Sequence, residues 1–326
     1  MTELTCKIET WPLAVPFNIS RGAKTEAHVV VASLRDGDFV GRGECVPYAR
    51  YGETLQGVAE AINSLDADIH NGLTRAELQL ALPPGAARNA LDCAFWDLEA
   101  KRTGKPVWQL ANCPPPAPLV TAFSLSLDTP ENMREAAAQA AGRPLLKIKL
   151  GGEGDDARLS AIRDAAPNAK LIVDANEGWS PETLSVNTDA MARYDVALIE
   201  QPLPAGNDEI LRDYDSPVPI CADESCHGIA SLGPLIGKYD TVNIKLDKTG
   251  GLTEALAAAR AARDLGFRIM VGCMVGTSLG MAPAMLVAGP QDIVDLDGPL
   301  WLREDRTPGI VFRGSEMQPP PPELWG

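Results

Sequence analysis

Two lysines lie two residues apart in a short apolar run that ends at two glycines. The run Leu145–Leu150 contains Lys147 and Lys149 and is followed by Gly151 and Gly152, which is typical of a short buried strand. Residues two apart on a strand point to the same face, so both ammonium groups share one face. Two buried cations are costly unless an anion lies between them, and each lowers the basicity of the other. An edge strand with two solvated lysines is the alternative from this segment alone.

Further charged residues end later apolar runs at regular intervals. They are Asp174, Glu200, Asp223 and Lys245, and successive members counted from Lys149 are separated by 22 to 26 residues. This spacing is close to one strand and one helix. If the runs are consecutive parallel strands of a closed barrel, all these residues lie on its carboxyl-end rim, where catalytic groups gather in such barrels.

Asp174, Glu200 and Asp223 predict a divalent metal site. Three neighbouring carboxylates after apolar runs need a compensating charge, and oxygen ligands favour a hard cation, so we expect one Mg²⁺ per active site. Asn176 and Glu224 are candidates to orient the ligands or a lysine through hydrogen bonds. The alternative, that each acid caps the next helix, is more plausible for one acid than for three at this spacing.

The two outer lysines predict proton transfer on both faces of a substrate. Lys149 and Lys245 belong to the second and sixth runs, which lie on opposite sides of an eight-stranded barrel. One lysine can remove a proton α to a carboxylate while the other returns it from the opposite side. We expect the metal to stabilise the resulting enediolate, and Lys147 to keep the pKa of Lys149 low enough for it to act as a base.

The elements that must position these groups form two patterns. Residues up to about 45 alternate as strands, with a polar, basic loop over residues 17–24, and helical patterns follow near 53–71 and 85–103. We therefore expect an N-terminal α+β domain over residues 1–114, ending in a proline-rich break.

After that break, short apolar runs alternate with amphipathic helical stretches. The runs are Thr121–Leu127, Leu145–Leu150, Lys170–Asp174, Val196–Glu200, Val218–Asp223, Thr241–Leu246, Arg268–Cys273 and Asp292–Leu296. Eight strands alternating with helices predict an α/β fold of the (β/α)8 type over residues 115–297. Residues 298–326 remain as a C-terminal segment.

In these motifs the sequence resembles the enolase superfamily, muconate-lactonizing subgroup. The resemblance is carried by Lys147-x-Lys149, Asp174, Glu200, Asp223 and Lys245, and it covers the whole chain. It implies a modified TIM barrel, a capping domain at the N-terminus and a C-terminal segment that returns to the cap. For this superfamily a lysine base with Mg²⁺ and an enediolate is already described.

A second acidic pair suggests the substrate class. Asp295 and Asp297 follow the eighth run, and two carboxylates there suit a substrate with a free ammonium group. In dipeptide epimerases of the superfamily, which this chain resembles, such an Asp-x-Asp holds the N-terminal amino group. A solvated acidic loop is the alternative. Arg21 or Lys24 could bind the side-chain carboxylate of an acidic substrate, with Arg21 favoured for its bidentate geometry.

The resemblance implies an isomerase that transfers a proton at the Cα of the C-terminal residue of a dipeptide. The implied reaction is interconversion of L-Ala-D-Glu and L-Ala-L-Glu in recycling of murein peptides. Cys273 and Met274, which end the seventh run, are expected to shape the substrate pocket. Alternatives are another activity of the subgroup, o-succinylbenzoate synthase or muconate cycloisomerase, and a non-catalytic ligand-binding barrel.

Composition narrows the functional class further. The chain has 326 residues and a net charge of −15, which argues against general affinity for nucleic acid or anionic membranes. Seven cysteines without zinc-like spacing are expected to be reduced thiols. The first residues lack a signal-peptide pattern and no apolar run approaches membrane-spanning length, so we expect a cytoplasmic protein. Assembly into a homo-oligomer stays open.

Overall fold

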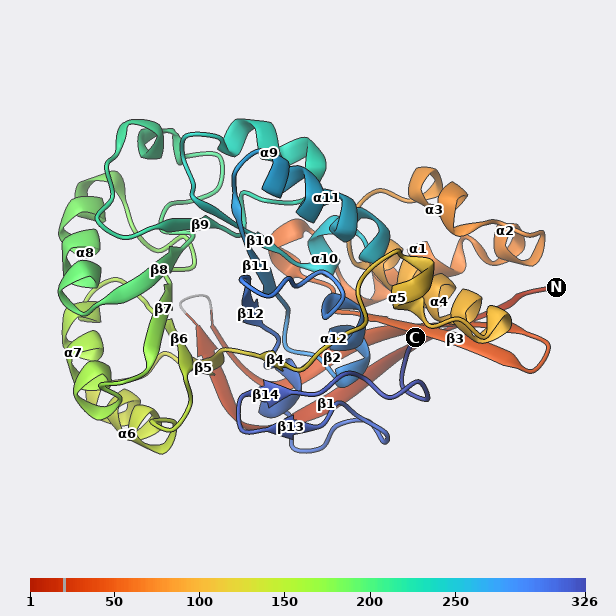
Figure 1. Cartoon of the computed structure of the whole chain (residues 1–326), viewed down its shortest axis with the longest axis horizontal. Helices are drawn as coiled ribbons and strands as arrows, with labels where there is room; N and C mark the ends of the chain where they lie inside the picture. Colours follow the sequence, from red (N-terminus) through yellow and green to blue (C-terminus); the bar gives the residue numbers. More distant parts are fainter. Residues whose placement is uncertain (20–21) are drawn as a thin grey trace.

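The computed structural model describes residues 1–19 and 22–326. Figure 1 shows a barrel of strands and helices beside a smaller body built from the N-terminal part of the chain, and both chain ends lie on the side of that smaller body. We call the smaller body the cap. Within the described residues, no helix combines the length and hydropathy needed to cross a membrane.

The cap consists of an antiparallel sheet covered by helices. Its strands are β1 (Glu3–Ile19), β2 (Gly22–Asp36) and β3 (Phe39–Cys45), in the order β1-β2-β3. A short 3-10 turn η1 (Ala49–Tyr51) precedes the helices α1 (Leu55–Asn63), α2 (Asp66–His70), α3 (Arg75–Ala81), α4 (Ala86–Thr103) and α5 (Val107–Leu110). The predicted α+β character of the N-terminal part is therefore confirmed.

The ends of β1 and β2 correct one expectation. The sequence predicts a loop over residues 17–24, but β1 and β2 pair as far as Ile19 opposite Gly22, and residues 20 and 21 lie outside the described residues. The pairing shifts register between Pro12 and Phe17, and β1 contacts the barrel, where the Asn18 amide donates to Ser126 Oγ at 2.6 Å. Pairing between β1 and β2 satisfies the backbone N–H and C=O groups of residues for which polar composition alone predicts a loop.

The second body is an eight-stranded parallel barrel, as predicted. Its strands are β5 (Phe123–Leu125), β6 (Leu145–Lys149), β7 (Lys170–Asp174), β8 (Val196–Glu200), β9 (Ile220–Ala222), β10 (Thr241–Ile244), β11 (Arg268–Gly272) and β12 (Ile293–Asp295). They pair in sequence order from β5 to β12. A single parallel bridge between Thr121 and Val294 joins the two edges of the sheet. Several strands, such as β5, β9 and β12, are shorter than the predicted apolar runs at both ends.

Helices surround the barrel, and this covering explains why the strands are apolar along their whole length. They are α6 (Pro130–Gln139), α7 (Asp155–Ala165), α8 (Pro181–Arg193), α9 (Ile229–Leu235), α10 (Leu246–Thr249), α11 (Leu252–Asp264) and α12 (Ser278–Ala284), with 3-10 turns η2 (Glu209–Asp213) and η3 (Gly298–Trp301). Figure 1 shows α6, α7 and α8 along the outer side of β5 to β8. Strands covered on both faces bury nearly every residue, which selects continuous apolar runs.

The C-terminal segment contacts both bodies. Strand β13 (Phe312–Arg313) pairs with β14 (Glu316–Met317), and β14 pairs with β4 (Leu119–Val120) at the start of the barrel. At the end of the chain, the Trp325 indole donates to the Cys93 carbonyl of α4 at 3.0 Å. The division of the chain at residues 114 and 297 stays a prediction.

The contact between β3 and α4 leads to a test of cap packing. A Cβ added at Gly43 would lie 2.1 Å from the Ala90 carbonyl oxygen and 2.8 Å from the Ala94 nitrogen. We expect Gly43→Ala to lower the free energy of unfolding by about 2 kcal/mol or more, because backbone atoms cannot move aside as a flexible side chain would. Urea-induced unfolding measures the change.

Gly142→Ala is the matched control, because an added Cβ there meets nothing within 4 Å. It should change the free energy of unfolding by no more than about 0.5 kcal/mol. Equal stability of the two variants would contradict the close approach of β3 to α4.

Candidate active site

Strand register brings the predicted residues of three strands side by side. Lys149 on β6 lies opposite Asp174 on β7, and Asp174 lies opposite Glu200 on β8. Asp223 follows the last residue of β9 directly, and Lys245 follows β10. All five side chains are buried. The carboxyl ends of five consecutive strands therefore supply one row of charged groups.

The order of the strands places Lys149 and Lys245 on opposite sides of the barrel. Their strands, β6 and β10, are four positions apart in a closed sequence of eight. The strands between them on one side, β7 to β9, are those that carry Asp174, Glu200 and Asp223. A ligand above these three carboxylates would have one lysine on each flank.

Each of these lysines contacts one of the carboxylates. Lys149 Nζ donates to Asp174 Oδ2 at 2.6 Å, and Lys245 Nζ donates to Asp223 Oδ2 at 2.6 Å. Burying a charge is tolerated when an opposite charge and hydrogen bonds compensate it. These ion pairs explain how two lysine side chains can be almost completely buried.

Lys147 lies deeper and joins carboxylates from three strands. Its Nζ is 2.6 Å from Glu200 Oε2, 2.8 Å from Asp295 Oδ2 and 3.3 Å from Asp174 Oδ2. Burial acts to lower the pKa of Lys147, but the charges of these carboxylates outweigh it and raise the pKa well above its usual value. Lys147 therefore stays positively charged, and its influence on the pKa of Lys149 stays a prediction.

The carboxylates differ in their electrostatic environments. Burial opposes ionisation of Asp174, but the ammonium groups of Lys149 and Lys147 dominate and lower its pKa. For Glu200, burial and the neighbouring charge of Asp174 raise the pKa above its usual value, despite Lys147. The lysines therefore do not fully compensate the negative charges that lie together near Glu200 in this buried site.

A cavity of about 80 Å³ opens above this row of charges, between the barrel and the cap. Of the predicted residues already placed, Lys147, Lys149, Asp223 and Lys245 line it. The other predicted residues in its lining are Lys24, Asn176, Glu224, Cys273, Met274, Asp295 and Asp297. Lys24 reaches it from β2, with its Nζ 5.6 Å from the centre of the Tyr48 ring. Arg21 lies outside the described residues, so its predicted role stays untested.

The acidic pair after β12 lies at one end of the cavity. Asp295 Oδ2 is paired with Lys147, whereas Asp295 Oδ1 is buried and has no hydrogen-bond partner among the described residues. Asp297 Oδ2 accepts from the Ser124 amide at 2.7 Å. Burial and the charge of Asp295 raise the pKa of Asp297. A positively charged ligand group would give Asp295 Oδ1 a partner and would lower the pKa of Asp297.

The cap closes the cavity through the loop that contains η1. Arg50 forms a bidentate pair with Glu177 of the barrel, at 2.9 and 2.8 Å. Tyr51 lines the cavity and packs edge-on against His227, with ring centres 5.0 Å apart. Cap and barrel thus both contribute to the walls of the site, which limits access of water.

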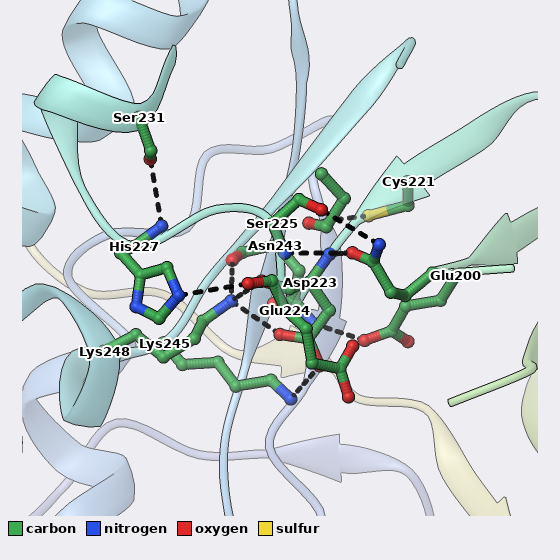
Figure 2. Close-up of polar contacts among 12 residues, drawn as sticks. Glu200, Cys221, Asp223, Glu224, Ser225, His227, Ser231, Asn243, Lys245 and Lys248 are labelled. Atoms are coloured by element: carbon green, nitrogen blue, oxygen red, sulfur yellow. Dashed lines mark hydrogen bonds and ion pairs between the residues drawn. The ribbon is translucent and has the colours of Figure 1, made fainter. Parts of the chain in front are cut away.

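Two polar residues of the site are absent from the sequence prediction. Asn243 Nδ2 donates to Glu200 Oε1 at 2.7 Å, and Lys248 Nζ lies 2.6 Å from Asp223 Oδ1. Figure 2 shows Lys248 and Lys245 both directed toward Asp223. Asn243 could have been found from the sequence, because it precedes Lys245 by two residues and so shares its face of the strand.

A buried amide supports the Asp223 loop from behind. Gln201 Oε1 accepts from the backbone amides of Asp223 at 2.9 Å and Ser225 at 3.1 Å. Its Nε2 donates to the Tyr239 hydroxyl at 3.0 Å. Gln201 adopts a φ of 35°, a conformation that persists only when surrounding contacts hold it. These bonds fix the position of the Asp223 backbone and therefore the point from which its side chain extends.

The donor set of the three predicted ligands fits a hard cation. Among residues 1–19 and 22–326, no three Asp, Glu, His or Cys side chains converge as a ready metal cage. Lysine ammonium groups lie against Asp174, Glu200 and Asp223. Buried carboxylate oxygens from adjacent strands are nevertheless the ligands that Mg²⁺ prefers. A divalent cation would compensate the charge that raises the pKa of Glu200.

Lys248 gives a test of charge compensation in the site. We expect Lys248→Met to lower the free energy of unfolding by about 3 kcal/mol, because it leaves Asp223 Oδ1 buried without its cation. Lys105→Met is the control at an exposed lysine and should change stability by no more than about 0.5 kcal/mol. Urea-induced unfolding compares the two, and a loss below about 1 kcal/mol for Lys248→Met would contradict the assignment.

Comparisons with known proteins match both bodies. A family model described as mandelate racemase/muconate lactonizing enzyme, N-terminal domain, matches residues 1–111. A second model, described as enolase C-terminal domain-like, matches residues 131–321.

Characterised relatives match over nearly the whole chain. The L-Ala-D/L-Glu epimerase of Escherichia coli K12 is 48% identical over 311 residues, which cover 95% of this chain and 97% of the relative. An N-acetyl-D-glutamate racemase of a Pseudoalteromonas species is 47% identical and covers 91% of this chain and 95% of its own length.

Solved structures agree with the fold. An enolase family member from Agrobacterium tumefaciens, described as homologous to dipeptide epimerases with bound sodium and L-Ala-L-Glu, is 54% identical, with a TM-score of 0.98 over 100% of both chains. A dipeptide epimerase from Enterococcus faecalis complexed with Mg and L-Leu-L-Tyr is 30% identical, with a TM-score of 0.90 over 97% of this chain and 96% of its own. The chain belongs to the mandelate racemase/muconate lactonizing enzyme family of the enolase superfamily.

Proposed function

We propose that the protein is a Mg²⁺-dependent dipeptide epimerase that interconverts L-Ala-D-Glu and L-Ala-L-Glu. The observation that carries this proposal is the placement of Lys149 and Lys245 on diametrically opposed strands, with three carboxylates on the strands between them. Similarity to an L-Ala-D/L-Glu epimerase and to a structure with bound L-Ala-L-Glu supports this substrate. We further propose a cytoplasmic role in recycling murein peptides.

In this proposal, Asp174, Glu200 and Asp223 hold the metal ion. Related dipeptide epimerases with bound Mg support the choice of metal. When bound, Mg²⁺ supplies positive charge that compensates the charge developing on the substrate carboxylate. Asn243 and Lys248 orient Glu200 and Asp223 through the contacts described above.

The proton at Cα moves between two lysines. One lysine removes it from one face of the substrate, and the other delivers a proton to the opposite face, which inverts the configuration. Because the reverse reaction exchanges these roles, Lys149 and Lys245 each act as acid in one direction and base in the other. The cap excludes water, which would otherwise compete for the proton.

The remaining polar groups of the substrate have partners at the ends of the cavity. The ammonium group would lie between Asp295 and Asp297, where Asp295 Oδ1 lacks a hydrogen-bond partner among the described residues. The glutamate side-chain carboxylate would lie toward the β1–β2 hairpin, where Lys24 lines the cavity. Arg21 is the alternative partner for that carboxylate.

Racemisation of N-acetylglutamate is a second candidate, because a relative with that activity is 47% identical. An N-acetyl group carries no charge, so it would leave Asp295 and Asp297 buried without a cation from the substrate. A lyase activity of the muconate-lactonizing subgroup meets the same objection. Parallel assays with L-Ala-L-Glu and N-acetyl-L-glutamate therefore separate the candidates.

Isotope exchange tests the two-lysine mechanism. With wild-type protein and Mg²⁺ in D2O, we expect L-Ala-L-Glu to lose its glutamate α-proton signal as the D-epimer forms. Lys149→Ala and Lys245→Ala should each reduce epimerisation by at least about 10³-fold, because inversion needs a group on both faces. Each variant should still exchange the α-proton of one epimer, since one lysine remains. Proton NMR and chiral chromatography give the two readouts.

The mechanism requires the two variants to exchange the α-proton of different epimers. If Lys149→Ala and Lys245→Ala exchange the same epimer, the lysines do not address opposite faces. Absence of both exchange and epimer formation in the wild-type protein, with exchange of N-acetylglutamate, would favour the second candidate.

Asp295 gives a test of the substrate ammonium group. We expect Asp295→Asn to lower kcat/KM for L-Ala-L-Glu by about 10- to 100-fold, because a hydrogen bond between two charged groups is lost. The inhibition constant of N-propionyl-L-glutamate, which has the same shape without the ammonium group, should change less than threefold. Steady-state kinetics measure both, and equal losses would assign Asp295 a structural role only.

A further inference from the structure

An aromatic stack borders the acidic end of the cavity. The Trp301 ring of η3 packs edge-on against Phe17 of the cap hairpin, with centres 4.5 Å apart. Its other neighbour is Phe123 of β5, stacked at 5.9 Å with planes 6° apart. The Arg143 guanidinium lies 4.0 Å from the centre of the Phe123 ring. Cap, barrel and the segment after β12 thus meet at Trp301.

The Trp301 indole also contacts the acidic pair. Its Nε1 donates to Asp297 Oδ2 at 3.1 Å, and the Ser124 amide donates to the same oxygen at 2.7 Å. Two donors on one carboxylate oxygen fix the rotation of the carboxylate. The other oxygen, Oδ1, is then the one that a substrate ammonium group would reach.

A second cavity lies along the outer side of the stack. It has a volume of about 380 Å³, and its lining includes Phe123, Ser124, Arg143 and Trp301. Ser124 also lines the cavity above the lysines and carboxylates. Trp301 is only 6% exposed and lines the second cavity. It contacts Phe17 and Asp297, which line the cavity above the lysines, so it lies behind this part of the wall.

We propose that Trp301 positions Asp297 and limits the size of the side chain on the substrate's N-terminal residue. This inference rests on the proposed function, because it assumes that the ammonium group lies at Asp295 and Asp297. An ammonium group held there places the N-terminal side chain next to the stack. By holding Phe17 and Asp297 of the cavity wall in place, the indole ring confines that side chain to a small group such as the methyl of alanine.

Trp301→Phe separates the positioning role from the packing role. Phenylalanine keeps an aromatic ring beside Phe17 and Phe123 but removes the N–H that holds Asp297. We expect KM for L-Ala-L-Glu to rise about tenfold, with kcat changed less than threefold, because the lost hydrogen bond serves a charged group. The inhibition constant of N-propionyl-L-glutamate should stay within twofold, since this compound has no ammonium group.

Trp325→Phe is the matched control. Trp325 is also buried, and its indole donates to the Cys93 carbonyl in the cap, away from the cavity. Loss of this N–H should leave KM for L-Ala-L-Glu within twofold of wild type. An equal rise in KM for both variants would overturn the positioning role of Trp301.

Trp301→Leu and Trp301→Ala test the size limit. Both replacements join the acidic end of the site to the second cavity, so larger N-terminal residues gain space. We expect the ratio of kcat/KM for L-Leu-L-Glu to that for L-Ala-L-Glu to rise at least tenfold relative to wild type. Leucine is included because it preserves more of the buried volume, and thermal unfolding confirms that each variant is folded.

The results distinguish this inference from the function on which it rests. If wild-type protein does not epimerise L-Ala-L-Glu, the proposed function fails. If the wild type does so, and folded Trp301 variants keep both KM and the substrate ratio within twofold of wild type, the inference about Trp301 is overturned while the function stands.

Discussion

Ammonium and carboxylate groups alternate at the mouth of the barrel, almost entirely removed from water. Lys149 lies against Asp174, Lys147 against Glu200, and Lys245 against Asp223. None of these charges could remain buried alone, because the desolvation cost of an unpaired ion exceeds what packing returns. The carboxyl ends of the parallel strands, held in register, are what keep the opposite charges within contact distance. Every other feature of the site depends on this alternation.

The cap is required because such a set of charges works only when water is scarce. The hairpin of β1 and β2 supplies Phe17, and the η1 loop supplies Tyr51, to the wall above the charges. Low dielectric strengthens the interaction of the lysines with their carboxylates and with any ion that replaces them. A barrel without the cap would expose the same residues to solvent and weaken each of these interactions.

Much of this arrangement could be predicted from the sequence because it repeats. A charged residue after an apolar run, at intervals of one strand and one helix, places Asp174 and Glu200 on the same rim without any knowledge of side-chain contacts. Lys248 and Trp301 could not be predicted in this way. Lys248 contacts Asp223 from α10, which follows the neighbouring strand β10, and Trp301 gains its role only where three distant segments meet. The loop prediction was wrong for residues 17–19 and 22–24, because pairing between β1 and β2, rather than composition, decides their conformation.

The two groups of residues occupy different strands, which separates chemistry from substrate choice. In the proposed function, proton transfer and metal binding use β6 to β10, whereas the acidic pair and the aromatic stack belong to β12, β5, η3 and the cap hairpin. The ion pair between Lys147 and Asp295 links the two groups. We therefore expect a change at Asp297 or Trp301 to alter which amino end is accepted without disturbing the opposed lysines, whereas a change at Asp295 also removes a carboxylate from Lys147. Two relatives about half identical to this chain carry the names L-Ala-D/L-Glu epimerase and N-acetyl-D-glutamate racemase. The substrates in both names are N-acylglutamates, and they differ in whether the acyl group carries an ammonium group, which is the feature that the acidic pair would recognise in the proposed function.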